Sequence, residues 1–329
     1  MRVALFASDG FGGYVFDTVR EAADVDLVCV VGDTVSTRGR LERKLRAIAR
    51  RPSRALRTIR KALHKDLDPP PPPSMRAASQ QKHPGLAELC ARHDIPFHED
   101  YELAAGAFAR HLHSLDLDLI FVATFGALLS SKVLAAPKRG AANLHFALLP
   151  QFRGLTPEMS CLLEGSAQSG ATVHFIDEGV DTGDIIAQRA VDVAPDDDFR
   201  ALQAKLYPLG RDMIADALQA FVKGPVEARP QDETQASKCR RPRGFNAILP
   251  DETPPDRVRN ILRACMATRY TPYVPQEDGS RLYLLDAEWI DAGKSNDAPT
   301  AGIVLRIPCA GGELLVRRAW QRGREIGGN

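Results

Sequence analysis

The sequence predicts an α/β protein with a doubly wound, mostly parallel sheet and a smaller, mostly β domain at its C-terminal end. Three observations support this. Strand patterns alternate with helical patterns through the first part of the chain, residues 115–124 (LDLDLIFVAT) end in the apolar, β-branched run of a buried parallel strand, and the composition shifts toward Pro, Arg and short strands from Pro225 onward. A chain of 329 residues with 44% hydrophobic content can form a packed core and more than one domain.

The first elements follow the strand-turn-helix order of such a sheet. Residues 3–7 predict a strand, residues 8–13 a glycine-rich turn, residues 14–23 a helix and residues 27–31 a second strand. Beyond them we expect a helix over residues 85–94, a strand over 95–97, a helix over 102–113, the strand within 115–124 and a strand over 171–176.

The first turn also raises a dinucleotide-binding hypothesis. Gly10 and Gly12 follow a strand, and Asp33 lies about 20 residues further on, as in the nucleotide-binding fingerprint. Val15 occupies the place of the third glycine, which favours a tight strand-to-helix turn over a nicotinamide nucleotide site.

Residues 34–75 form an apparent insertion after the second strand. Within it, residues 38–65 carry twelve Lys or Arg and one acidic residue, Glu42, so this basic arm has a charge near +11. Because the whole chain has a net charge of +1, the remainder is near −10. Apolar residues recur at helical spacing along the arm, and residues 69–73 predict a stiff polyproline tether. Such charge asymmetry is typical of polyanion binding or of a solvated face.

The cysteines and histidines give no sign of a metal centre or a disulfide framework. The six Cys form no CxxC pair, and the histidines between residues 83 and 113 have no ligand spacing with them. No run approaches the roughly 20 apolar residues of a membrane span, and the opening segment is too short for a signal peptide. We therefore expect a cytoplasmic protein with reduced thiols and no metal.

Three polar residues stand out as a candidate catalytic set. Asn143 and His145 alternate on a short strand-like segment, so their side chains leave the same face, and Asp181 lies in the loop after the strand over residues 171–176. An amide and an imidazole can donate hydrogen bonds to a developing oxyanion, and a carboxylate can orient the imidazole or take a proton through it. Together they suit the transfer of an acyl carbon onto an amine.

Each residue also has a structural explanation. A lone histidine between apolar neighbours is commonly a buried, hydrogen-bonded group, and Asp181 could cap a turn before Thr182, as could Asp184. His174, on the strand before the loop, is expected to be structural or to support the site from behind. The combination around His145 favours catalysis, while we interpret Asp184 as structural.

The combined motifs resemble those of the folate-dependent formyltransferase family, which includes methionyl-tRNA, glycinamide ribonucleotide and amino-sugar formyltransferases. The matching elements are Asn143-x-His145, Ala147-Leu-Leu-Pro150, Arg153-Gly154 and Asp181-Thr-Gly-Asp184. Ala147 stands where the family usually has Ser, which removes one hydroxyl near the site. The resemblance covers about the first two hundred residues and implies a Rossmann-like catalytic domain.

The resemblance implies roles for particular residues. Asn143, His145 and Asp181 would be catalytic, with 10-formyltetrahydrofolate as the formyl donor. Arg153 and Gly154 would bind substrate, although for Arg153 a turn-fixing hydrogen bond is an equal alternative. The residues expected to hold the folate are Phe125, Gly126, Leu128, Leu129, Asp177, Glu178, Gly179 and Val180.

The acceptor remains open between two classes. Residues 156–158 and 173–177 look more like the small-metabolite branches of the family, which favours an amino sugar nucleotide or a biosynthetic amine. The alternative is methionyl-tRNA, because the tRNA enzymes carry a shorter basic loop at the point of the basic arm. Phosphate binding or homodimer formation would also suit this arm.

The expected domains are residues 1–224 for catalysis, a linker over 225–244 and a small, mostly β domain over 245–329. A helix over residues 197–221 ends the first part, and Pro208 should kink or split it. The last part predicts a helix over 255–267 and strands over 281–290, 300–307 and 313–318, similar to the second domain of several family members.

Overall fold

The structure is a computed structural model that describes residues 1–32, 84–104, 106–239, 244–266, 268, 270–293 and 301–327. The predicted insertion over 34–75, with its basic arm and polyproline tether, lies outside the described residues, as does Asp33.

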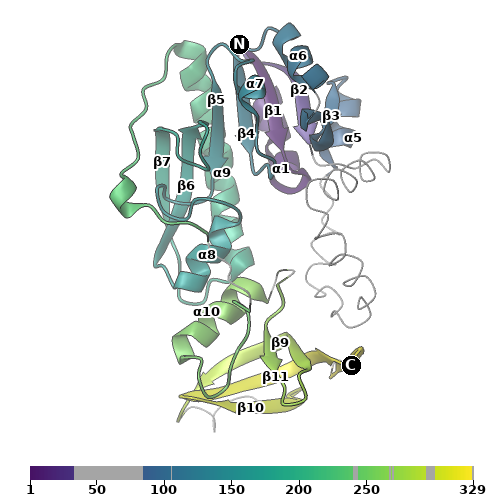
Figure 1. Ribbon diagram of the computed structural model, residues 1–329, viewed down its shortest axis with the longest axis vertical. Helices are drawn as coiled ribbons and strands as arrows, with labels where there is room; N and C mark the ends of the chain where they lie inside the picture. The colour runs from purple at the N-terminus through teal and green to yellow at the C-terminus, as the bar shows by residue number, and fades with distance from the viewer. Residues whose placement is uncertain are drawn as a thin grey trace.

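The larger part is built on one seven-stranded sheet with the order β3-β2-β1-β4-β5-β6-β7 (Figure 1). The strands from β3 to β5 are parallel, while β6 runs antiparallel to both of its neighbours. This confirms the prediction of a mostly parallel α/β sheet. The strands are β1 Arg2–Ala7, β2 Asp26–Gly32, β3 Phe97–Glu99, β4 Leu119–Ala123, β5 Ala141–His145, β6 Gln168–Phe175 and β7 Ile185–Asp192.

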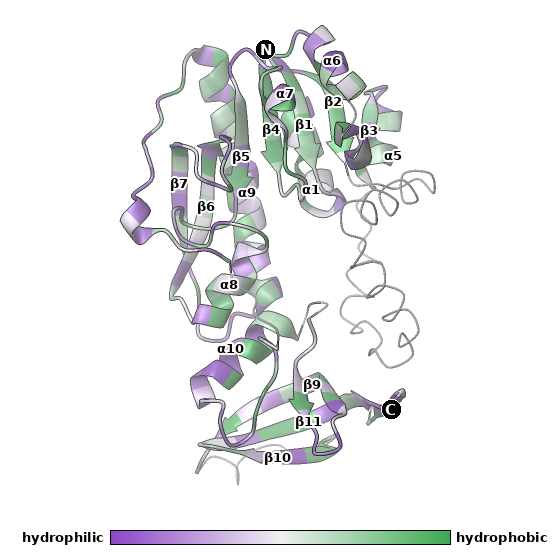
Figure 2. Cartoon of the chain, viewed as in Figure 1, coloured by the Kyte–Doolittle hydropathy of each residue, from purple (hydrophilic) through white to green (hydrophobic). Residues whose placement is uncertain are grey.

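Helices cover both faces of this sheet because its central strands are apolar on both sides. All five residues of β4 are buried, and β1, β2 and β4 are the most hydrophobic ribbons in Figure 2. One core cluster lies under α1 Asp9–Arg20, α5 Leu86–Arg92, α8 Pro157–Glu164 and α9 Phe199–Lys223. A second lies on the opposite face under α6 Gly106–Ser114, which follows the short helix η2 Asp100–Ala104, and α7 Ser131–Leu134.

The first helix begins earlier than the sequence predicted. The glycines expected to form a turn lie inside α1, which starts at Asp9. A Cβ at Gly12 would lie 2.6 Å from the Cβ of Ala7 and 2.8 Å from Cδ1 of Leu86. Gly12 therefore lets α1 approach β1 and α5 closely, which accounts for the glycine without a nucleotide.

Helix α9 is continuous, so of the two predicted effects of Pro208, a kink or a split, the split does not occur. Asp198 caps its N-terminus by accepting hydrogen bonds from the backbone N–H groups of Arg200 and Ala201. Buried residues on either side of the proline, from Leu202 to Phe221, pack it against the sheet. This packing outweighs the roughly 3 kcal/mol that an interior proline costs a helix.

Helix α8 and strand β7 were not predicted from the sequence. Seven of the eight residues of α8 are buried, so its sequence lacks the amphipathic pattern on which helix prediction relies. Strand β7 is the edge strand of the sheet and is half-exposed, with no strong apolar alternation.

The C-terminal part is a helix followed by a sheet, which confirms the prediction of a mostly β part, and the pairs within the sheet are antiparallel. Helix α10 Pro255–Cys265 lies against α8, where the guanidinium of Arg257 donates a hydrogen bond to the carbonyl of Leu163 at 2.6 Å. The sheet has the order β10-β11-β9-β8, with β12 paired to β11 (Figure 1). Its strands are β8 Tyr273–Pro275, β9 Arg281–Asp291, β10 Leu305–Cys309, β11 Gly312–Gln321 and β12 Arg324–Ile326.

Across the described ranges, no helix combines the length and apolar character that crossing a membrane would require.

Candidate active site

A cavity of about 600 Å³ opens at the carboxyl ends of β4 and β5, within the size range of small-molecule sites. It reaches both faces of the sheet. On the α7 side, its wall comes from the loops after β4 and β6, where Phe125, Leu129 and Ile176 pack against the second core cluster. On the α9 side, its wall comes from the start of α8 and from α9, where Tyr207 stacks on Phe146 in the first core cluster.

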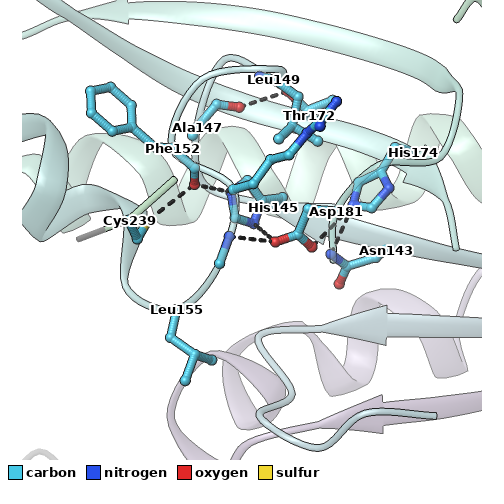
Figure 3. A network of polar contacts seen from close by, with 12 residues as sticks. Asn143, His145, Ala147, Leu149, Phe152, Leu155, Thr172, His174, Asp181 and Cys239 are labelled. Carbon is cyan, nitrogen blue, oxygen red and sulfur yellow. Dashed lines mark hydrogen bonds and ion pairs between the residues drawn. The ribbon is translucent and has the colours of Figure 1, made fainter. Parts of the chain in front are cut away.

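The predicted trio meets in the wall of this cavity. Asn143, His145 and Asp181 all line it, and Figure 3 shows the Asp181 carboxylate between the rings of His145 and His174. One carboxylate oxygen lies 3.6 Å from Nδ1 of His145, and the other lies 3.6 Å from Nε2 of His174. The loop between β6 and β7 folds back over β5 and brings Asp181 to these side chains.

The hydrogen bonds of His145 define its protonation. Nε2 lies 2.9 Å from the carbonyl oxygen of Phe152, and a carbonyl can only accept, so Nε2 carries the hydrogen. In the neutral ring, Nδ1 therefore holds the lone pair on the side of Asp181. Burial lowers the pKa of His145, and the Asp181 charge only partly offsets this effect. The ring is thus a neutral base near pH 7, and a proton gained at Nδ1 would face a carboxylate.

His174 is a site residue to which the sequence analysis gave only a supporting or structural part. Its Nδ1 donates to the carbonyl of Phe175 at 2.7 Å, which leaves Nε2 to accept from the Asn143 amide at 3.0 Å. This fixes the Asn143 side chain so that one amide N–H is used and the other remains for a ligand. The contact between His174 and Asn143 follows from the strand register, because the two residues stand directly opposite each other across the β5–β6 pair.

Asp181 is held ionised in an uncommon backbone conformation. Its φ of 53° lies in the left-handed region, and its Oδ2 accepts a hydrogen bond from the Gly154 N–H at 2.7 Å. Burial opposes ionisation, but the contacts with His174, His145 and Gly154 prevail and lower the pKa of Asp181 to about 2. The turn-capping alternative for Asp181 is not what the geometry favours, because the carboxylate contacts the site rather than its own turn.

Seven of the eight predicted folate-binding residues line the α7 side of the cavity; Glu178 does not, and it is exposed. Two of the seven are unusually exposed apolar residues, Leu128 at 82% and Val180 at 50%. Exposed apolar residues gathered at a cavity mouth are typical of a ligand-binding surface. The nearby turn is tight, because a Cβ at Gly183 would lie 1.9 Å from the carbonyl oxygen of Phe175.

The two predicted substrate-binding residues differ in position. Gly154 lines the cavity, but Arg153 does not. The Arg153 side chain is 5% exposed, and its guanidinium donates to both carboxylate oxygens of Glu233 at 2.6 and 2.9 Å and to Oε1 of Gln231 at 2.7 and 3.1 Å. The geometry favours the structural alternative for Arg153, since its donors are used within the protein.

The hydroxyl absent at Ala147 has a counterpart on the neighbouring strand. Thr172 of β6 donates from Oγ1 to the Ala147 carbonyl at 2.6 Å and accepts from the Leu149 N–H at 3.2 Å (Figure 3). The side-chain amide of Gln188 donates to the same oxygen at 2.9 Å. Thr172 therefore fixes the turn that follows His145 from across the sheet.

The α9 side of the cavity contains polar residues that the sequence analysis did not select for the site. Glu158, Gln203 and Tyr207 line it, and Glu158 is hydrogen-bonded to Gln203. Burial raises the pKa of Glu158, and burial together with the Glu158 charge raises the pKa of Tyr207 to about 12. Their spacing on α8 and α9 looks like ordinary helix sequence, so only the tertiary structure brings them to the cavity.

Within the described ranges, no group of three or more His, Cys, Asp or Glu side chains is arranged to hold a metal ion. The chemistry that the cavity wall itself supplies is hydrogen-bond donation by Asn143 and proton acceptance by His145, stabilised by Asp181.

Comparisons with known proteins agree with this fold. The formyl transferase family matches residues 1–218. A methionyl-tRNA formyltransferase from Staphylococcus aureus strain JH1 is 31% identical over 217 residues, which are 66% of this chain and 69% of that protein. The N-formyltransferase from Helicobacter canadensis, solved with folinic acid and dTDP-3-aminofucose, has a TM-score of 0.60 at 14% identity and covers 97% of this chain and 99% of its own. The sugar 3N-formyl transferase WlaRD, solved with dTDP and 5-N-formyl-THF, has a TM-score of 0.59 at 14% identity over 98% of each chain.

Proposed function

Because this chain belongs to the formyl transferase family, it is an enzyme that transfers formyl groups, and we propose that it moves the formyl group of 10-formyltetrahydrofolate onto the primary amine of a small molecule. An amino sugar nucleotide or a biosynthetic amine is the acceptor class that we favour.

The observation that carries the proposal is the convergence of Asn143, His145 and Asp181 on one cavity. In the proposed reaction an uncharged amine attacks the formyl carbon, and the free N–H of Asn143 donates to the oxyanion that forms. His145 accepts the amine proton at Nδ1, and the resulting imidazolium is stabilised by the Asp181 carboxylate. The proton then passes to the leaving nitrogen of the folate.

The α7 side of the cavity suits the folate. Its wall is mostly apolar and contains Gly126 and Gly179, where backbone can approach a flat ring closely. The Helicobacter canadensis enzyme and WlaRD were solved with folinic acid and 5-N-formyl-THF, which are reduced formyl folates. These two structures support a folate donor for this chain.

The α9 side suits a small polar amine. Of the charged groups in the cavity wall, Glu158 lies on the α9 side, Asp181 lies between the two sides and Asp177 lies on the α7 side. No Lys or Arg lines the cavity among the residues that the structure describes. Acidic groups favour an amine over an anionic acceptor at the reacting end. The C-terminal part over residues 245–329 has eleven basic and eleven acidic residues, so it lacks the positive charge that nucleic-acid binding uses.

Methionyl-tRNA is the second candidate. It is supported by the 31% identity to the Staphylococcus aureus enzyme and by the charge of the basic arm, which lies outside the described residues. The match to that enzyme covers 66% of this chain, whereas the two sugar N-formyltransferase structures cover nearly all of it. This difference in coverage is why we favour a small acceptor.

The test is a direct assay. The protein is incubated with 10-formyltetrahydrofolate and either a panel of nucleotide-linked amino sugars and biosynthetic amines or methionyl-tRNA, and tetrahydrofolate release is measured. We expect release with a small amine and none with a His145→Ala variant. Transfer to methionyl-tRNA alone would replace the favoured acceptor, and no release with any amine would contradict the proposal.

A further inference from the structure

The segment over residues 229–239, which the sequence treats as part of a linker, runs back along the sheet and contacts the catalytic loops. In Figure 1 the chain leaves α9, descends beside β7 and turns toward α8. Arg229 exchanges two backbone hydrogen bonds with Ile185 at 2.8 and 2.9 Å, which places this strap at the edge of the sheet. The strap includes the short helix η3 Glu233–Gln235.

We propose that this strap, and above all Gln231, positions the catalytic pair His145 and Asp181 for the reaction. The inference rests on the proposed function, since it concerns the same site. Gln231 does not line the cavity, so its role is that of a positioning residue.

Gln231 uses its whole side-chain amide to join the two catalytic loops. Nε2 donates to the backbone carbonyls of Asp181 at 2.9 Å and Gly183 at 2.7 Å. Oε1 accepts two hydrogen bonds from the guanidinium of Arg153. The loop that carries the catalytic carboxylate is thereby tied to the loop that supplies the Gly154 N–H to that carboxylate.

The strap contacts residues that have unfavourable backbone conformations. Asp181 and Phe152 have φ values of 53° and 57°, in the left-handed region that non-glycine residues seldom adopt. Such conformations persist when surrounding contacts hold them, and they concentrate at active sites. The Gln231 side-chain amide donates a hydrogen bond to the Asp181 carbonyl, and the Ser237 hydroxyl oxygen accepts a hydrogen bond from the Phe152 N–H at 2.9 Å.

Phe152 links the strap to the base. Its carbonyl accepts the Nε2 hydrogen of His145 at 2.9 Å and also a hydrogen bond from Sγ of Cys239 at 3.1 Å (Figure 3). Backbone bonds continue on both sides, from Arg153 N to the Ser237 carbonyl at 2.9 Å and from Cys239 N to the Arg153 carbonyl at 2.8 Å. The strap thus fixes the acceptor that determines the tautomer of His145.

The strap also explains why the Arg153 guanidinium can be buried. A buried guanidinium is costly unless it is paired, and here Glu233 and Gln231 supply both partners from the strap. Because the backbone N–H of the next residue, Gly154, bonds Asp181, a shift of Arg153 would be passed directly to the catalytic carboxylate.

The test is a double-mutant cycle in the full chain. We expect Gln231→Ala to lower kcat by about 10- to 100-fold, because displacing a catalytic group by about 1 Å has such effects, and to leave the KM of the donor nearly unchanged. In an Asp181→Asn background, Gln231→Ala should lower kcat only slightly further, because the effect of Gln231 on kcat passes through Asp181. Gln219→Ala on α9, which removes a comparable hydrogen bond from the Gln219 amide to the Ala23 carbonyl, is the matched control and should retain full activity.

The pH dependence separates positioning from loss of folded protein. Moving Asp181 away removes the charge that raises the pKa of His145, so in Gln231→Ala the acid limb of the kcat profile should move to lower pH. An unchanged profile with a uniformly lower kcat, additive effects in the cycle, or full activity would each overturn the inference.

A substrate-free measurement keeps this inference apart from the proposed function. The pKa of His145, followed by NMR of its ring proton, should be lower in Gln231→Ala than in the wild type even if no acceptor has been found. A wild-type value in the variant would refute positioning by Gln231, whereas a lowered value beside an inactive wild type would refute only the proposed acceptor or donor.

Discussion

The two sides of the cavity differ in chemistry although the proposed catalytic trio adjoins both. The α7 side is formed by two loops rich in glycine and exposed apolar residues, such as Leu128 and Val180. The α9 side is formed by helices and presents buried polar groups, of which Glu158 and Tyr207 have raised pKa values because of burial. A loop wall can receive a flat ring against its backbone, while a helix wall holds side chains rigidly enough to select an acceptor.

The position of the trio explains how such different walls can serve one reaction. Asn143 and His145 end β5, the strand between the two sides, and Asp181 arrives from the loop after β6. Ligands in open α/β sheets bind at the carboxyl ends of strands, where segments from both faces meet. In the proposed reaction, the donor and the acceptor would therefore approach His145 from opposite faces of the sheet.

Removing the shared base should have the largest effect. We expect His145→Ala to lower kcat by about 10³-fold, within the range for loss of general base catalysis, at saturating levels of both substrates. Steady-state kinetics would measure this, with His113→Ala on the surface of α6 as the control. A loss confined to one substrate's KM would show that His145 belongs to one side of the cavity only.

The next largest effect should come from the α9 side. Glu158→Gln keeps the shape and the contact with Gln203 but removes the carboxylate, so we expect the KM of the acceptor to rise about 10-fold, as loss of a hydrogen bond to a charged group allows. The KM of the donor should stay the same, as should both constants in Glu164→Gln at the other end of α8. A change in the donor KM instead would reverse the assignment of the two sides.

A smaller effect is expected on the α7 side. Leu128 is 82% exposed without ligand, so Leu128→Ala should leave thermal stability unchanged and raise the donor KM about 3-fold through lost apolar contact. Steady-state kinetics at varied concentrations of 10-formyltetrahydrofolate would measure the donor KM, and Leu305→Ala, which truncates an exposed leucine of β10, is the matched control. Equal losses in both variants would remove Leu128 from the donor site.

The smallest expected effect is a shift in pH dependence. Burial lowers the pKa of His145, so its NMR titration midpoint should lie below the usual 6.5, and the neutral, active form should persist as the pH falls through that value. Asp181→Asn removes the charge that raises this pKa, so the midpoint should fall further. A midpoint that rises in the variant would show that Asp181 does not contact a protonated His145.

The local sequence was enough to predict the sheet class and to select the proposed catalytic trio, because both depend on short patterns. Apolar runs identify buried strands over a few residues, and Asn143 and His145 leave one face because strand side chains alternate. The same reasoning failed at Gly12 and at Pro208, where the deciding contacts come from Leu86 and from the packing of α9 on the sheet. Arg153 was similarly undecided, since its partners Gln231 and Glu233 lie 78 and 80 residues away along the chain.

By itself, the sequence determined the α/β sheet, the mostly β character of the C-terminal part and the choice of three residues for the proposed acyl transfer, since each follows from residue type and short-range spacing. Only the tertiary structure decided that β6 is antiparallel, that His174 orients Asn143, that Glu158 reaches the cavity and that the strap bonds both catalytic loops. The physical reason is that hydrogen bonds and burial depend on which distant segments meet, and that pairing is fixed by the packing of the whole core.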